Sequence, residues 1–176
     1  MRLHDYLDFH ARETPDAEFA IFEKRVVTYA EAKQRVDQIA NALLAEGLGV
    51  GDRVAILAKN CVEYPLFYFA CSKMGAAPVP LNYRLAPPEW AYILRDAQAQ
   101  LVVARGDLAR AIDTVRAELP TRRWLALATD PPAGWDRFEA WADAASAASA
   151  APVKCEIDDQ ADAYQMYTSG TTGRPK

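Results

Sequence analysis

The fold is decided by Gly51-Asp52-Arg53-Val54-Ala55-Ile56-Leu57, a turn followed by a run of apolar residues. The glycine and aspartate predict the turn, and the five residues after them predict a buried strand. The chain then predicts a helix over residues 63–74 that ends at Gly75, and a second strand over residues 77–81. Buried strands separated by helices are typical of a parallel sheet with right-handed crossovers.

The same alternation continues along the chain. The expected elements are a helix over residues 88–97, a strand over 101–103, a helix over 107–118 that begins at Asp107, and a strand over 124–128. The fold class is therefore expected to be α/β, a parallel sheet flanked by helices, and strand ends in such sheets are where ligands bind. Four apolar strand residues are expected to be buried: Val54, Ile56, Val102 and Leu125.

Smaller elements are expected at the amino-terminal end. A short amphipathic helix is predicted over residues 3–12, with Leu3, Tyr6 and Leu7 as its buried stripe. Residues 19–22 and 26–27 flank three charged residues, which predicts a β-hairpin.

Thr28 predicts the start of the next helix, because Glu31 follows three residues later and completes a capping box. Gly47 predicts the end of this helix. Apolar residues recur at helical spacing between these two positions: Ala32, Val36, Ile39, Ala40, Leu43 and Leu44.

Residues 129–153 interrupt the alternation. They begin with a turn cluster and continue into an alanine-rich stretch that favours a helix. The apolar face of that helix is thin, so a peripheral excursion is expected here. Three aromatic residues, Trp135, Phe138 and Trp141, favour packing over membrane docking, because Arg137 is the only cation near them in the sequence.

The composition narrows the class of protein. The chain has 176 residues, enough for one domain with a hydrophobic core, and is 51% hydrophobic and 25% charged. Its net charge of −4 argues against a nucleic-acid-binding surface. Neither a targeting nor a membrane-spanning segment is evident in the sequence. Cys61, Cys71 and Cys155 lack metal-ligand spacing and favour reduced thiols in a cytoplasmic protein.

The candidate functional stretch is Tyr167-Thr168-Ser169-Gly170-Thr171-Thr172-Gly173-Arg174-Pro175-Lys176. Its glycines let a ligand approach the main chain, and successive backbone N–H groups in such a turn bind phosphate oxygens. Hydroxyl groups and a lysine ammonium add donors and positive charge. The predicted phosphate-binding residues are Thr168, Ser169, Gly170, Thr171, Thr172, Gly173 and Lys176.

This spacing differs from that of the commoner P-loop, G-x-x-x-x-G-K-[ST]. Only two residues separate Gly170 from Gly173, and Arg174-Pro175 precedes the lysine. A P-loop phosphotransferase is therefore disfavoured.

An acidic run precedes the loop and consists of Glu156, Asp158, Asp159 and Asp162. Paired carboxylates of this kind are able to hold magnesium, but a solvated connection is the favoured interpretation. Residues 163–167 would then form a strand that delivers the phosphate-binding loop at its carboxyl end.

The final ten residues match Y-T-S-G-T-T-G-x-P-K at every specified position, and so resemble the phosphate loop of the adenylate-forming superfamily. This superfamily contains acyl-CoA synthetases, peptide-synthetase adenylation domains and luciferases. Residues 81–85, followed by Pro87-Pro88-Glu89, look most like the fatty-acyl-CoA synthetase branch. Other stretches resemble landmarks of the amino-terminal lobe, in the same order: Thr28-Tyr29-Ala30-Glu31, Gly51-Asp52-Arg53-Val54-Ala55, Lys73-Met74-Gly75-Ala76 and Val79-Pro80-Leu81-Asn82.

The resemblance implies a two-step ligase. A carboxylic acid, for this branch a fatty acid, attacks the α-phosphate of Mg-ATP to give an acyl-adenylate and pyrophosphate. The thiol of coenzyme A then accepts the acyl group. Thr168 to Lys176 would hold the β- and γ-phosphates and stabilise charge on the leaving pyrophosphate. The implied cofactors and co-substrates are ATP, Mg²⁺ and coenzyme A, and no residue is assigned as a metal ligand.

The resemblance covers most of this chain but only the first part of a family enzyme. Residues 1–176 are therefore expected to be a partial amino-terminal adenylation domain that ends inside the phosphate loop. Such a fragment is expected to be inactive alone, with its catalytic residues beyond Lys176 in the remainder of the same polypeptide. Two alternatives stay open: an adenylation enzyme with a peptide-synthetase-type or carrier-protein acceptor, and a non-catalytic nucleotide-binding fragment.

Overall fold

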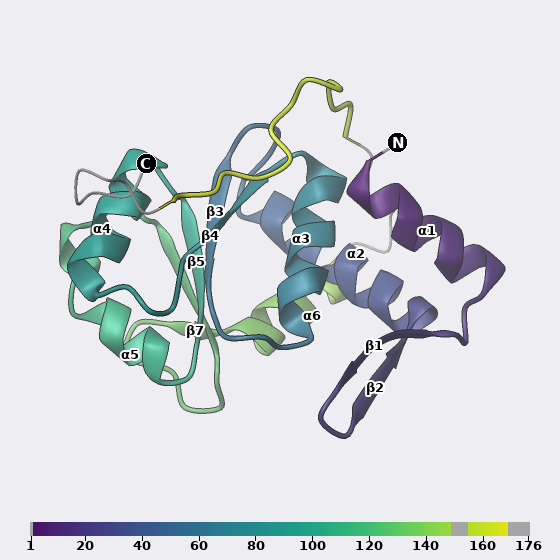
Figure 1. Ribbon diagram of the computed structural model, residues 1–176, viewed down its shortest axis with the longest axis horizontal. Coiled ribbons are helices and arrows are strands. Elements are labelled where there is room, and N and C mark those ends of the chain that lie inside the picture. Colours follow the sequence, from purple (N-terminus) through teal and green to yellow (C-terminus); the bar gives the residue numbers. More distant parts are fainter. Residues whose placement is uncertain (1, 149–154, 169–176) are drawn as a thin grey trace.

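The computed structural model describes residues 2–148 and 155–168 (Figure 1). Its main feature is a five-stranded sheet in the order β4-β3-β5-β6-β7, in which every neighbouring pair is parallel. The strands are β3 (Arg53–Leu57), β4 (Ala77–Pro80), β5 (Leu101–Arg105), β6 (Arg123–Leu127) and β7 (Asp136–Arg137). The predicted α/β fold with a parallel sheet is confirmed.

Helices α3, α4 and α5 connect strands of the sheet, and together with α2 and α6 they cover both of its faces. In Figure 1, α4 and α5 lie on one face, and α2, α3 and α6 lie on the other. Their bounds are α2 (Tyr29–Ala45), α3 (Glu63–Met74), α4 (Pro87–Asp96), α5 (Asp107–Asp113) and α6 (Phe138–Ala148). Helix α5 is shorter than predicted, because the chain leaves it after Asp113 and makes a 3-10 turn over Arg116–Glu118.

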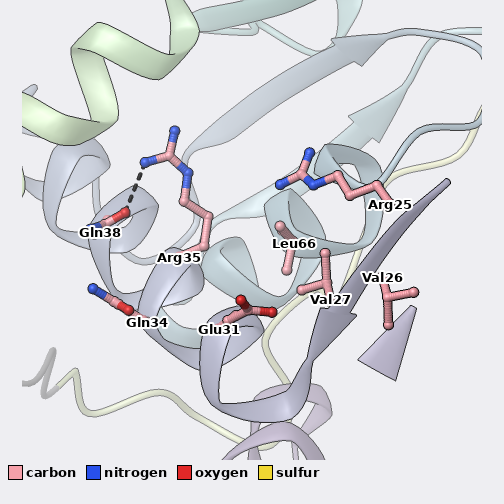
Figure 2. A pocket seen from close by; sticks show the side chains of 8 residues that line it. All are labelled: Arg25, Val26, Val27, Glu31, Gln34, Arg35, Gln38 and Leu66. Carbon is pink, nitrogen blue, oxygen red and sulfur yellow. Dashed lines mark hydrogen bonds between the residues drawn. The ribbon is translucent and has the colours of Figure 1, made fainter. Parts of the chain in front are cut away.

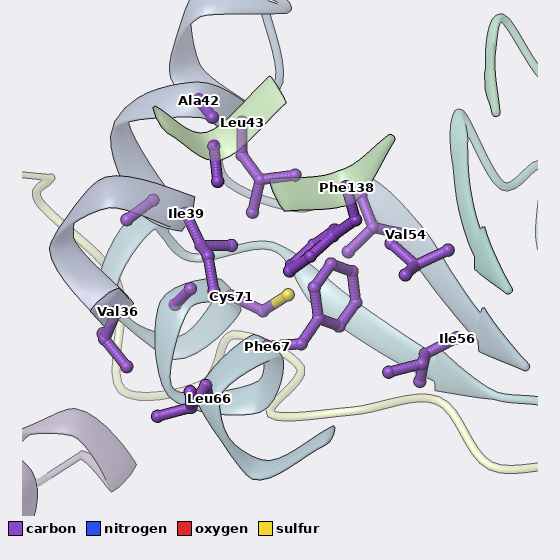
Figure 3. Packing of buried hydrophobic residues seen from close by; sticks show 14 of the residues in the cluster. Val36, Ile39, Ala42, Leu43, Val54, Ile56, Leu66, Phe67, Cys71 and Phe138 are labelled. Carbon is purple, nitrogen blue, oxygen red and sulfur yellow. The ribbon is translucent and has the colours of Figure 1, made fainter. Parts of the chain in front are cut away.

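The core consists of two apolar clusters, one on each face of the sheet. Because side chains alternate along a strand, Val54 and Ile56 of β3 point into the cluster under α2, α3 and α6 (Figure 3). Ala55 and Leu57 point into the cluster under α4 and α5. The four strand residues predicted to be buried, Val54, Ile56, Val102 and Leu125, are all fully buried.

A two-stranded hairpin and two helices form the amino-terminal part of the chain. These are α1 (Leu3–Glu13), β1 (Glu18–Phe22), β2 (Arg25–Thr28) and α2, and the two strands pair antiparallel as predicted. The capping box of α2 is also confirmed. The Glu31 N–H donates to Thr28 Oγ1 at 3.3 Å, and the Thr28 N–H donates to Glu31 Oε2 at 2.9 Å.

The predicted buried stripe of α1 is wrong at two of its three positions. Leu7 is 1% exposed, but Leu3 is 44% and Tyr6 is 56% exposed. His4 and Asp8 of this helix face α3 instead, and both make polar contacts there. His4 Nδ1 lies 3.0 Å from Ser72 Oγ, and Lys73 Nζ donates to Asp8 Oδ1 at 2.9 Å.

The described part of residues 129–153, which ends at Ala148, contains β7 and α6. Phe138 (Figure 3) is fully buried in the cluster that contains α2. Ala142 is fully buried in the same cluster. On the surface, Arg35 of α2 pairs with Asp143 of α6 at 2.6 Å. This segment is therefore tied to the core more closely than the expected peripheral excursion.

Candidate nucleotide-binding site

Only the entrance to the predicted phosphate-binding loop lies within the described residues. Thr168 is described, whereas Ser169, Gly170, Thr171, Thr172, Gly173 and Lys176 lie outside the described part of the chain. Their roles therefore stay predictions. The segment that leads into the loop, residues 155–168, is described in detail.

This segment passes from the amino-terminal helix, across the sheet, to α4 (yellow in Figure 1). Its first half lies against the start of the chain, where Arg2 Nη2 donates to the carbonyl oxygen of Ile157 and lies 3.9 Å from Asp159 Oδ1. Its second half meets the beginnings of β3 and β4, because Arg53 and Pro78 contact Gln165. The loop is thus approached from the amino-terminal ends of these strands.

Residues 163–167 are extended but are not a strand, so the prediction of a strand is wrong here. One sheet-like bond is present, from the Gln165 N–H to the Pro78 carbonyl oxygen at 3.0 Å. The side chains nevertheless alternate as they would in a strand. Tyr164 and Met166 are 54% and 59% exposed, while Gln165 and Tyr167 are turned toward the protein.

The inward side chains form a continuous set of hydrogen bonds. Arg53 Nε donates to Gln165 Oε1 at 3.1 Å, and Gln165 Nε2 donates to Tyr167 Oη at 2.8 Å. The Tyr167 hydroxyl donates in turn to Asp96 Oδ2, on the last residue of α4. Burial, followed by this hydrogen bond to Asp96 and by the charge of Asp96, raises the pKa of Tyr167. The tyrosine that precedes Thr168 is therefore held as a neutral phenol.

The acidic run before the loop is exposed and pairs with arginine. Asp162 Oδ2 lies 3.0 Å from Arg53 Nη2, and Asp159 lies near Arg2. The Asp158 side chain accepts from the Gln160 N–H at 2.8 Å, which closes a turn. Within residues 2–148 and 155–168, no group of three acidic, histidine or cysteine side chains is arranged to hold a metal ion.

A separate polar pocket of about 280 Å³ lies between the hairpin and α2 (Figure 2). Arg25 and Arg35 line it, and both are already neutralised. Arg25 Nη1 lies 2.6 Å from Glu63 Oε1, and Arg35 pairs with Asp143 and Glu139. The pocket is thus poorly suited to an anionic ligand.

Sequence reasoning did not assign a role to three residues at the entrance of the loop: Arg53, Asp96 and Gln165. The sequence carries a signal for Arg53, because it belongs to the landmark Gly51-Asp52-Arg53-Val54-Ala55, but that stretch predicts only a turn and a strand. No local pattern could have connected it to residues more than 100 positions away.

Among solved structures, the chain superposes with a TM-score of 0.86 on the anthranilate CoA ligase AuaEII in complex with anthranoyl-AMP. The two are 26% identical, and the match covers 100% of this chain and 34% of that one. The sheet, its helices and the segment that leads to the loop are thus those of the amino-terminal region of an adenylate-forming enzyme.

Relatives and a family description agree with this class. The family described as AMP-binding enzyme matches residues 7–176, and the chain belongs to it. The chain is 34% identical over 168 residues to the fatty acid–[acyl-carrier-protein] ligase ScoC of Streptomyces coeruleorubidus. It is 37% identical over 155 residues to the long-chain-fatty-acid–CoA ligase FadD13 of Mycobacterium tuberculosis. These matches cover 96% and 85% of this chain, but only 30% and 28% of the relatives.

In the described residues, no helix is both long and apolar enough to cross a bilayer.

Proposed function

We propose that this chain is the amino-terminal part of an ATP-dependent acid–thiol ligase. The observation that carries the proposal is the stretch Tyr167 to Lys176, which matches the phosphate loop of the family at every specified position. Membership of the AMP-binding enzyme family supports it, because the relatives with which it aligns are named as ligases of carboxylic acids. The complete enzyme would activate a carboxylic acid as an acyl-adenylate.

The loop residues would act on the leaving group of the first step. The acid carboxylate attacks the α-phosphate of Mg-ATP, the bond to the β-phosphate breaks, and pyrophosphate leaves with the extra negative charge. Thr168, Ser169, Gly170, Thr171, Thr172 and Gly173 supply hydroxyl and backbone N–H donors to the β- and γ-phosphates, and Lys176 supplies a positive charge. Mg²⁺ bound to the phosphates shields their charge.

The acyl group would pass to coenzyme A, and the acid would be a fatty acid. The similarity to FadD13, named as a long-chain-fatty-acid–CoA ligase, favours both assignments. The similarity to ScoC favours a second candidate, in which the acceptor is an acyl carrier protein. AuaEII and an indoleacetate–CoA ligase extend the range of candidate acids to aromatic ones.

The 176 residues alone would not complete this reaction. They correspond to less than a third of ScoC and FadD13, and we place the catalytic residues and the rest of the nucleotide site beyond Lys176. The complete enzyme would work in the cytoplasm. Residues 1–176 would form the first part of its adenylation domain and end inside the phosphate loop.

Carboxylate-dependent exchange of labelled pyrophosphate into ATP tests this function. The complete polypeptide is assayed with fatty, aromatic and short-chain acids, and the 176-residue chain serves as a control. We expect exchange with a fatty acid for the complete polypeptide, and none for the control. Absence of exchange with every acid would refute the ligase. If exchange occurs but the acyl group is then transferred only to a carrier protein, the acceptor is a carrier protein and not coenzyme A.

A further inference from the structure

Four side chains at the entrance of the loop form a hydrogen-bonded relay with a single direction. Every donor in it points the same way, from the Arg53 guanidinium through the Gln165 amide and the Tyr167 hydroxyl to the Asp96 carboxylate. The relay thus begins at a cation and ends at an anion. Hydrogen bonds in such a chain polarise one another, so each bond strengthens its neighbours. The two ends also fix the orientation of the Gln165 amide, whose oxygen must face Arg53 and whose nitrogen must face Tyr167.

The relay joins three parts of the molecule that are distant in sequence. Arg53 is the first residue of β3, Asp96 is the last residue of α4, and Gln165 and Tyr167 belong to the extended segment. Gln165 is attached a second time, by the backbone bond from its N–H to the Pro78 carbonyl oxygen. The Tyr167 ring also packs against the apolar cluster under α4 and α5. Gln165 is thus held at both its backbone and its side chain, and Tyr167, directly before Thr168, is held by its side chain.

We propose that Arg53, Gln165 and Asp96 are positioning residues for the phosphate-binding loop, acting through Tyr167. This inference rests on the proposed function for its catalytic consequence. The loop needs its backbone N–H groups at fixed places to bind phosphate, and a loop rich in glycine pays a large entropy cost for that order. Anchoring Tyr167 sets where the loop begins. The guanidinium of Arg53 also lies 3.0 Å from Asp162 Oδ2, so it ties a second point of the same segment to β3.

The first test uses the 176-residue chain and does not depend on activity. Tyr167→Phe removes the hydroxyl that connects Gln165 to Asp96 and keeps the ring. Amide hydrogen exchange is measured at Gln165, whose N–H is bonded to Pro78. We expect exchange at this amide to become about tenfold faster, because the segment opens locally more often.

Tyr164→Phe is the matched control. It makes the same substitution three residues earlier, on the exposed side of the same segment. Exchange at Gln165 should stay within about twofold of wild type in this variant. Equal exchange rates in the two variants would overturn the relay. Asp96→Ala is a second variant, which removes the carboxylate that accepts from the Tyr167 hydroxyl and should also speed exchange at Gln165. Asp96→Glu keeps a carboxylate and is expected to restore slow exchange.

The second test measures the consequence in the complete polypeptide. Tyr167→Phe and Asp96→Ala are expected to raise KM for ATP about tenfold, with KM for the carboxylic acid unchanged. A variant that merely loosened the fold would change both constants and lower the melting temperature. An unchanged KM for ATP would overturn the positioning role. If wild type showed no carboxylate-dependent exchange, the ligase assignment would fail, while the hydrogen-exchange result would still decide whether the relay anchors the segment.

Discussion

Lys73 brings a charged group into the layer of helices on one face of the sheet. Its side chain is 6% exposed, and its ammonium group donates to Asp8 at 2.9 Å and to Asp37 at 2.5 Å. Three helices, α1, α2 and α3, therefore meet at one buried cation. A buried charge is tolerated only when it is paired, and the removal of one partner leaves the others without compensation.

Lys73→Met is expected to lower the free energy of unfolding by up to about 3–5 kcal/mol, because Asp8 and Asp37 lose their buried partner and keep only the more exposed Lys33. Lys33→Met is the matched control. Lys33 also contacts Asp37, at 2.5 Å, but its side chain is 39% exposed, so its loss should cost at most about 1 kcal/mol. Urea unfolding curves of both variants measure these losses of stability. Similar losses of unfolding free energy in the two variants would show that the burial of Lys73 does not matter.

The same lysine predicts a dependence of stability on pH. Burial lowers the pKa of Lys73, but hydrogen bonds to Asp37 and Asp8 outweigh burial, and the pKa lies above the ordinary value of 10.5. A raised pKa in the folded state contributes stability that is fully present below pH 10.5 and is lost as the pH rises through the folded value. The difference in unfolding free energy between wild type and Lys73→Met should therefore be constant from neutral pH to about pH 10 and shrink above it. A difference that grew with pH would contradict the assignment.

At the scale of elements, Gly75 decides how α3 ends and β4 begins. It has φ +79°, in the left-handed region, and a Cβ atom there would lie 2.9 Å from Val50 Cγ2. Gly47, which follows α2, has a similar φ of +76° but nothing within 4 Å of a Cβ atom. Substitutions at the two glycines therefore distinguish the effect of backbone strain, which both positions share, from that of steric contact, which only Gly75 has.

Gly47→Ala is expected to cost about 1 kcal/mol from backbone strain alone, and Gly75→Ala about 1–2 kcal/mol, because Val50 must also move. Thermal unfolding of the two variants measures both. Equal losses of stability in the two variants would show that the Val50 side chain moves aside without a free-energy cost. A smaller cost for Gly75→Ala would contradict the contact.

Elements were predictable where the chain carries its own local signal. The core strands followed from apolar runs bounded by turns, and the start of α2 followed from Thr28 and Glu31. Strand β7 carried no such signal, since Asp136–Arg137 is two exposed polar residues that pair with β6 only in the folded chain. The inward face of α1 was mispredicted because its polar residues find partners on α3, which a count of apolar residues ignores.

At the scale of the whole molecule, the interior strand β3 contributes side chains to both apolar clusters. Ile56 of β3 is fully buried, whereas Ile21 of β1 is 62% exposed. Ile56→Ala is expected to lower the unfolding free energy by about 2–5 kcal/mol through lost burial and the resulting cavity. Ile21→Ala should stay within about 0.5 kcal/mol of wild type. Chemical denaturation checks both, and a cost below about 0.5 kcal/mol for Ile56→Ala would remove it from the core.

The candidate site was predictable only as a motif. Ten consecutive residues carried the resemblance to a phosphate loop, and those beyond Thr168 lie outside the described structure. The relay that anchors the loop joins residues 53, 96, 165 and 167, which the fold alone brings together. Local propensities contain no term for such distant side-chain pairs, so this part of the site needed the structure.

Strand β4 lies at the edge of the sheet, and its sequence affects whether strands of other molecules are able to pair with it in a concentrated solution. Ala77 and Leu81 donate their N–H groups inward, to Asp52 and Ile56, so the alternate positions face outward. Those positions are Pro78 and Pro80, which have no N–H group. A strand from another molecule would find no N–H donor at either proline, and the Pro78 carbonyl oxygen already accepts from the Gln165 N–H. Aggregation by edge-to-edge strand addition is thereby discouraged, while the Pro78 carbonyl stays available to its own Gln165.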